Sequence, residues 1–262
     1  MLIINADDFG RSARTTSNIL ACFQKGTITT TSAMVFMADS ESSGELAQSV
    51  GLETGLHLNF TLKFDGHRVN SKLRDSHNRI ASFLLGGKYR LVLYNPLLVT
   101  DFDYVYKAQY EEYFRLYDRE PAHVNGHHHM HVCTNMIIGG LIPRGHRVRR
   151  SFSFNREEKG AANRFYRSLI DAWIAHRYTC TDYFYSIKPL EQISRLEHII
   201  KKSYSSNVEL SVHPDDPDEH KFLTGSTFSR ITRNATMCDY SNLSITTSAV
   251  LEKSSADKSG CK

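Results

Sequence analysis

Five of the chain's 13 histidines lie within nine residues. Imidazole is the commonest metal ligand in proteins, and its charge changes readily near neutral pH. In an extended strand alternate side chains share one face. The residues that would share it are His123, His127, His129 and His131. Burying four imidazoles on one face for packing alone would be costly. The run therefore indicates a metal or catalytic centre.

Three further polar groups follow segments with strand character. They are the adjacent carboxylates Asp7 and Asp8, His57 between apolar residues, and His213 before a proline. Neighbouring side chains on an extended chain point in different directions, so one carboxylate can bind a cation while the other faces a reacting atom. A helix-capping turn is the alternative for the carboxylate pair, and a core position is the alternative for His57. One Asp with two His suits Zn²⁺, Mn²⁺, Fe²⁺, Co²⁺ or Mg²⁺ and leaves room for water and substrate.

These residues need a scaffold that brings distant segments together, and strand-like and helical patterns alternate along the chain. Strands are expected at residues 2–6, 27–36, 54–60, in the histidine run after Pro121, and at 145–152, 180–185 and 208–213. Helices are expected at 12–25, 41–50, 101–119, 135–142, 157–176 and 190–204, with an irregular insertion or lid at 62–100. This order predicts an α/β fold with about seven parallel strands and the site at their carboxyl ends.

The composition is that of an ordinary globular protein, with 262 residues, 40% hydrophobic and 23% charged. We expect one catalytic domain over residues 1–240 and a low-complexity, disordered tail over residues 241–262. The net charge of +4 argues against a nucleic-acid partner. The basic run at 144–150 is expected to be solvated, with an anionic substrate group as the alternative.

The five cysteines form no CxxC pair, which argues against a disulfide framework or a thiolate zinc site. The first residues turn polar too early for a signal peptide, and no stretch is apolar enough for a membrane span. We therefore expect a cytoplasmic protein. Its oligomeric state is open, a homodimer included.

Four motifs, in this order, resemble those of the YdjC-like carbohydrate deacetylases, a group that includes chitooligosaccharide deacetylases. They are Asn5–Gly10 (NADDFG), Gly55–Leu58 (GLHL), His127–His131 (HHHMH) and Val212–Pro214 (VHP). The first and third together are quite specific, and the resemblance covers about residues 1–225. The family is similar to the NodB-type polysaccharide deacetylases, which implies a distorted (β/α) barrel with one divalent metal, Mg²⁺ or Zn²⁺.

The resemblance also implies a role for each residue of the motifs. Asp8, His57 and His127 would hold the metal, Asp7 would be the general base and His213 the proton donor. Asn125, His129 and His131 would support the ligands or contact substrate, and His128 would be structural. The implied reaction is metal-dependent removal of an N-acetyl group from a small amino sugar or chito-oligosaccharide.

Two positions depart from the family pattern. Asn125-Gly126 stands where the family commonly has Asp-Ser, which is expected to loosen the support of the metal ligands. Asp215 stands where the family often has glycine, and it is expected to add a carboxylate near His213. Two alternatives to deacetylation remain open. One is another metal-dependent amide or phosphoester hydrolase, and the other is an inert metal- or carbohydrate-binding protein.

Overall fold

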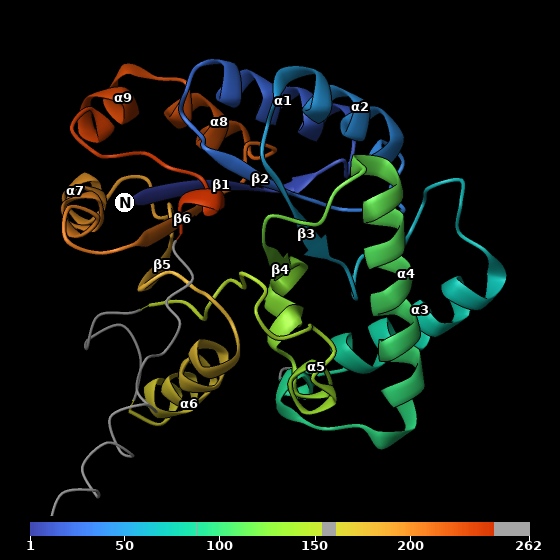
Figure 1. The fold of residues 1–262 in the computed structure, drawn as a ribbon. Coiled ribbons are helices and arrows are strands. Elements are labelled where there is room, and N and C mark those ends of the chain that lie inside the picture. Colours follow the sequence, from blue (N-terminus) through green and yellow to red (C-terminus); the bar gives the residue numbers. More distant parts are fainter. Residues whose placement is uncertain (88, 154–160, 244–262) are drawn as a thin grey trace, which may run out of the picture.

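Six parallel strands form one curled sheet in the order β4-β3-β2-β1-β6-β5 (Figure 1). The computed structural model describes residues 1–87, 89–153 and 161–243. The strands are β1 (Leu2–Phe9), β2 (Thr30–Ala33), β3 (Thr54–Leu58), β4 (Val124–Gly126), β5 (Tyr183–Ser186) and β6 (Val208–Val212). Every strand pairing is parallel, so all six carboxyl ends lie along one edge. The expected α/β, barrel-like fold is confirmed.

The segment 146–153 lies between the two edge strands and draws the sheet toward a closed barrel. On one side the Arg149 N–H donates to the Val124 carbonyl, and on the other the Ser153 N–H donates to the Phe184 carbonyl. Its sheet contacts are isolated bridges rather than a continuous ladder. The described residues therefore hold six strands rather than about seven, and 145–152 is a bridging segment instead of a strand.

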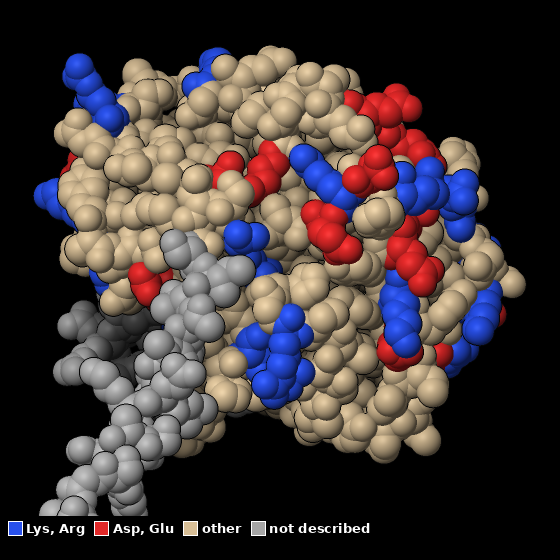
Figure 2. Space-filling model, in the orientation of Figure 1, with Lys and Arg blue, Asp and Glu red and all other residues tan. Residues whose placement is uncertain are grey.

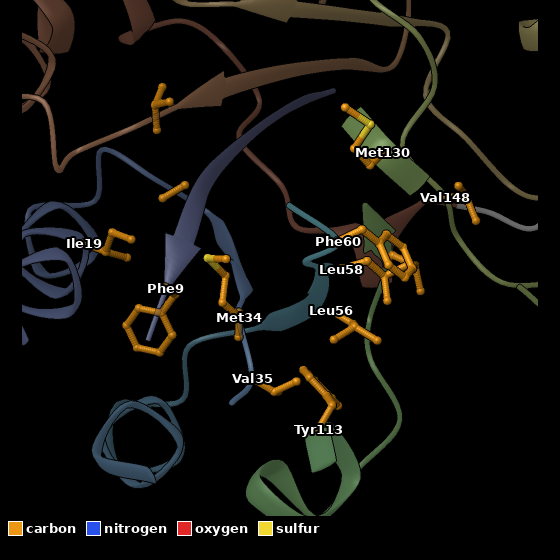
Figure 3. Packing of buried hydrophobic residues seen from close by; sticks show 14 of the residues in the cluster. Phe9, Ile19, Met34, Val35, Leu56, Leu58, Phe60, Tyr113, Met130 and Val148 are labelled. Atoms are coloured by element: carbon orange, nitrogen blue, oxygen red, sulfur yellow. The ribbon is translucent and has the colours of Figure 1, made fainter. Parts of the chain in front are cut away.

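The two faces of the sheet differ in chemistry, as β1 shows. Ile4 and Ala6 belong to the apolar core cluster, which Ile19 of α1 also joins. The residues between and after them, Asn5 and Asp7, form hydrogen bonds inside the curl of the sheet. Figure 3 shows apolar side chains of β1, α1 and the segment after β2 packed together. The main core therefore lies outside the curl. The interior holds the polar groups and, toward the start of β1, a small apolar cluster of Ile3, Tyr240 and Leu243.

Helices surround the outside of the sheet (Figure 1). The longer ones are α1 (Ala13–Gln24), α2 (Ser40–Val50), α3 (Ser71–Leu85), α4 (Val99–Tyr117), α6 (Ala161–Arg177) and α7 (Ile193–Lys202). The short ones are α5 (Thr134–Gly139), α8 (Pro217–Leu223) and α9 (Ser226–Thr232), together with the 3₁₀ turns η1 (Arg90–Val92), η2 (Pro96–Leu98), η3 (His127–Val132) and η4 (Tyr240–Asn242). Helices α8 and α9 were not among the expected elements.

Helix α3 overturns the expectation of an irregular stretch at 62–100. Its Asn70 cap accepts a hydrogen bond from the Leu73 N–H, which starts the helix. Leu73, Ile80 and Leu84 are buried at helical spacing. Two of the residues between them, Ser76 and His77, are polar and yet buried, which interrupts the apolar stripe in the sequence. The segment is thus an ordinary amphipathic helix followed by two 3₁₀ turns.

The C-terminal part of the described chain packs onto the start of β1. The Cys238 N–H donates to the Leu2 carbonyl, and Leu243 is buried. The expected disordered tail otherwise falls on residues 244–262, outside the described residues, as do the first four residues of the helix expected at 157–176. No helix within the described ranges has the length and apolar character needed to cross a bilayer. On the face shown in Figure 2, acidic and basic side chains are intermingled.

Candidate metal centre

The carboxyl end of β1 separates its two carboxylates. The pairing of β1 with β2 shifts register between Ala6 and Phe9, and Asp8 has a φ of 71°. A left-handed backbone is uncommon outside glycine, although aspartate tolerates it better than most residues. The irregularity sends Asp7 toward Arg149 inside the curl and Asp8 toward His57 and His127. The two adjacent carboxylates therefore lie in different environments.

The histidine run does not continue β4 as a strand. β4 ends at Gly126, and the next six residues form η3, in which His128 and His129 have φ angles of 52° and 58°. A Cβ at Gly126 would lie 2.9 Å from the His131 backbone nitrogen, so the chain turns back closely on itself there. The expectation that alternate histidines share one strand face is therefore wrong. Strand periodicity does not apply to a tight turn.

The histidines of the run occupy different environments. His123 is completely buried, His131 is buried with its Nε2 3.0 Å from the Arg149 carbonyl, and His129 packs edge-on against Phe152. Burial lowers the pKa of His131 to about 3 and holds the pKa values of His123 and His129 well below the usual range, so these three rings are neutral. His128 is exposed beside the His127 ring.

His127 is the member of the run that joins a group able to hold a metal. Asp8 Oδ1 lies 3.1 Å from His57 Nε2 and 2.9 Å from His127 Nδ1. One potential ligand atom from each of the three residues lies within 4.8 Å of the others. All three follow or end parallel strands, because β1, β3 and β4 deliver them to the same edge. This is the ligand set that the resemblance implied.

The orientation of His57 suits a metal. Its Nδ1 lies 2.7 Å from Asn125 Oδ1, an oxygen that can only accept, so the ring proton sits on Nδ1 and Nε2 points at Asp8. Burial would lower the pKa of His57, but the charges of Asp7 and Asp8 raise it. Burial likewise opposes ionisation of Asp8, yet hydrogen bonds from His127 and His57 hold its pKa below the usual range. Two imidazole nitrogens directed at one carboxylate oxygen form a donor set that fits a divalent cation.

Asp7 is a buried carboxylate surrounded by donors. Arg149 Nη1 donates to its Oδ2 at 2.7 Å, and Nη2 donates to its Oδ1 at 2.8 Å. Ser32 and Ser211 donate at 2.9 and 3.1 Å, and Asn5 at 2.6 Å. Burial alone would raise the pKa of Asp7, but the Arg149 guanidinium outweighs it and holds that pKa well below the usual range. Asp7 therefore stays ionised.

Sequence reasoning missed Arg149. It lies in the basic run that was expected to be solvated, and it is completely buried. Val148 beside it packs into the apolar core, so alternation turns the Arg149 side chain inward. The available signal was the presence of two carboxylates, Asp7 and Glu209, at inward positions of strands, because buried charges require partners.

His213 lies at the open edge of the interior, just after β6. Its Nε2 is 3.6 Å from Asp7 Oδ2, and its side chain is 44% exposed. The carboxylate beside it is Glu219, whose Oε2 accepts the His213 backbone N–H at 2.6 Å. Asp215 was expected there, but its side chain turns to helix α1, where Thr15 donates to it at 3.1 Å. That expectation is wrong because the loop after Pro214 bends toward α1.

Comparisons with known proteins point to one family. The sequence profile described as "YdjC-like protein" matches residues 1–251. A mouse carbohydrate deacetylase is 31% identical over 139 residues, and a chitooligosaccharide deacetylase of Yersinia pestis is 28% identical over 139 residues. Each alignment covers 52% of this chain, with 44% of the mouse protein and 52% of the Yersinia protein. The match thus spans about half the length of these curated relatives.

A solved structure extends the comparison to the whole fold. It is an Enterococcus faecalis protein described as a candidate cellobiose-phosphate cleavage protein. The TM-score is 0.62 at 16% identity, and the superposition covers 93% of this chain and 98% of that one. At this identity the likeness shows a common fold.

Proposed function

The chain belongs to the YdjC-like family, and on that footing we propose that it is a metal-dependent hydrolase that removes N-acetyl groups from a small amino sugar or chito-oligosaccharide. The observation that carries the proposal is the convergence of Asp8, His57 and His127 beside Asp7 and His213. Relatives named carbohydrate and chitooligosaccharide deacetylases support the substrate class.

One divalent ion, Mg²⁺ or Zn²⁺, would be held by Asp8 Oδ1, His57 Nε2 and His127 Nδ1. Three protein ligands leave coordination positions open for water and substrate. When bound, such an ion lowers the pKa of a water molecule and polarises a carbonyl oxygen. Asn125 holds the His57 ring in the tautomer that presents Nε2.

Asp7 is the proposed proton acceptor for the attacking water. Arg149 keeps it ionised and fixes both of its oxygens. The same pairing makes Asp7 a weak base, so it can take the proton only from a water that has itself become more acidic. Its Oδ2 is the oxygen nearer to His213. The position of that oxygen therefore defines where the water must lie.

His213 is the proposed proton donor to the departing amine. It lies 3.6 Å from Asp7 Oδ2, so donor and acceptor border the same space at the strand ends. The water oxygen bonds to the acetyl carbon, the carbon–nitrogen bond breaks, and the nitrogen takes a proton from His213. Acetate and a free amino sugar leave. Of the supporting residues, His131 contacts the Arg149 carbonyl, and His129 stays a prediction for substrate contact.

The test is acetate release from N-acetylglucosamine and from chito-oligosaccharides. Chelator-treated protein should be inactive, and Mg²⁺ or Zn²⁺ should restore activity. Asp7→Asn should lose nearly all turnover. A matched control is Asp101→Asn, because Asp101 is another ion-paired aspartate, held by Arg79 in a different part of the fold. Full turnover in Asp7→Asn would refute the assigned role of Asp7.

The alternatives give different outcomes. Phosphoester hydrolases commonly use two metals about 4 Å apart, whereas residues 1–87, 89–153 and 161–243 contain one group of potential ligands. Release of phosphate without release of acetate would support the phosphoester hydrolase. Sugar binding without hydrolysis, under every metal tried, would support an inert binding protein.

A further inference from the structure

A chain of buried, hydrogen-bonded polar side chains continues inward from Asp7. Arg149, which binds Asp7 through both Nη atoms, donates from Nε to Glu209 Oε1 at 2.6 Å. The other oxygen of Glu209 accepts the Tyr240 hydroxyl at 2.5 Å. Arg149, Glu209 and Tyr240 are each 0% exposed. The three side chains thus form a continuous connection that solvent does not reach.

The far end of this hydrogen-bonded chain is Tyr240, which is fixed near the start of β1, at the opposite end of the strand from Asp7. The Tyr240 ring stacks on His123, with centroids 4.0 Å apart and planes 14° apart. The Tyr240 backbone N–H donates to Glu53 at 2.8 Å. Two residues earlier, the Cys238 N–H donates to the carbonyl of Leu2, at the start of β1. Ring and backbone therefore both fix where the hydroxyl lies.

The geometry of the guanidinium makes these distant contacts matter at Asp7. The group is planar and presents its N–H donors as a rigid fork, so fixing one edge fixes the other. Glu209 Oε1 lies against the edge formed by Nε and Nη2, and the edge formed by the two Nη atoms holds Asp7. Phe184 lies against the face of the group, with the Arg149 Cζ 4.7 Å from the ring centroid. The contact with Glu209 at the edge of the guanidinium and the contact with Phe184 at its face together fix its position. They therefore determine where Arg149 holds the Asp7 carboxylate.

We propose that Glu209 and Tyr240 are positioning residues for Asp7, acting through Arg149. The inference rests on the proposed function, in which Asp7 accepts a proton. It extends the residues that serve the site to the start of β1 and to Tyr240, next to the expected tail at 241–262. Burial of the three groups for stability alone would not require the geometry of Asp7 to depend on Tyr240.

The experiment compares two variants that each remove a single buried hydroxyl. Tyr240→Phe leaves Glu209 Oε2 without its donor. Tyr178→Phe is the control, because the Tyr178 hydroxyl is buried and donates to the Ile142 carbonyl at 2.9 Å, away from Arg149. We expect Tyr240→Phe to lower kcat for acetate release about tenfold, the order expected for a lost hydrogen bond to a charged group. Its KM and metal affinity should stay within about twofold of wild type, and Tyr178→Phe should leave all three unchanged.

A second measurement is independent of turnover. In ¹⁵N-labelled protein, the Arg149 Nε–H should exchange slowly with water because it is buried and bonded to Glu209. Exchange should be roughly tenfold faster in Tyr240→Phe and unchanged in Tyr178→Phe. Unchanged kcat and unchanged exchange in Tyr240→Phe would overturn the inference. If wild type releases no acetate, the proposed function fails, and the exchange measurement still decides whether Tyr240 holds Arg149.

Discussion

Replacing Asn125 by leucine would remove the amide that orients His57. Asn125 is completely buried, and its Oδ1 lies 2.7 Å from His57 Nδ1. Its Nδ2 donates to Ser32 Oγ at 3.1 Å. Leucine has a similar size and branching, so the change is chiefly chemical. We expect the metal affinity to fall because nothing of equal strength then holds the proton on Nδ1.

The size of the loss follows from what remains around His57. Partners that orient a metal-binding histidine are generally worth 10- to 100-fold in affinity, and each factor of ten corresponds to about 1.4 kcal/mol. Ser32 Oγ lies 3.2 Å from the same Nδ1 and can accept its proton. The expected loss for Asn125→Leu is therefore about tenfold. Removing Ser32 as well, by Ser32→Ala, should bring the loss toward about 100-fold.

The assay is calorimetric titration of metal-free protein with Zn²⁺ and with Mg²⁺. The matched control is Asn135→Leu, because Asn135 is another buried amide, which bonds the Asn95 backbone through both its oxygen and its nitrogen. The control should bind metal as tightly as wild type. Equal affinity in Asn125→Leu, Asn135→Leu and wild type would refute the reasoning. It would mean either that His57 is not a ligand or that Nδ1 needs no partner.

Three further predictions concern stability. Arg149→Met leaves two buried carboxylates without a counter-charge and should lower the free energy of unfolding by about 3 to 5 kcal/mol. Arg150→Met, at a partly exposed ion pair, should lower it by about 1 kcal/mol or less. Equal losses in denaturant titrations would contradict this prediction. Asp215→Gly should change the melting temperature and acetate release little, because Asp215 forms only long, partly exposed ion pairs with Arg14 and Arg11 and none with His213. A large fall in kcat would show that Asp215 acts on the site. Burial lowers the pKa of His77 to about 4, so the unfolded chain binds a proton that the folded one rejects, and stability should fall as pH drops from about 6.5 to 4. His77→Leu should reduce the slope of the unfolding free energy against pH in that window without abolishing it, because His123, His129 and His131 also have pKa values lowered by burial. An unchanged slope would mean that His77 does not contribute to the loss.

Local patterns in the sequence were enough to predict the alternating fold and the edge at which its polar residues gather. Strands end near Asp8, His57 and His213 because apolar runs stop there, and hydrophobic period and strand length are properties of short segments. Helix α3 escaped prediction because its buried stripe includes the polar residues Ser76 and His77, which break the apolar pattern in the sequence.

The arrangement within the site depended on contacts between segments far apart in the chain. His127 alone of the run reaches Asp8 because η3 turns sharply after Gly126. That turn is held from outside by the contact between His131 Nε2 and the Arg149 carbonyl. Arg149 is buried because Asp7, 142 residues away, and Glu209 both need its charge. A basic residue in a basic run carries no local sign of such partners. The sequence by itself determined which residue types stand at the strand ends, and tertiary packing decided which of them face one another.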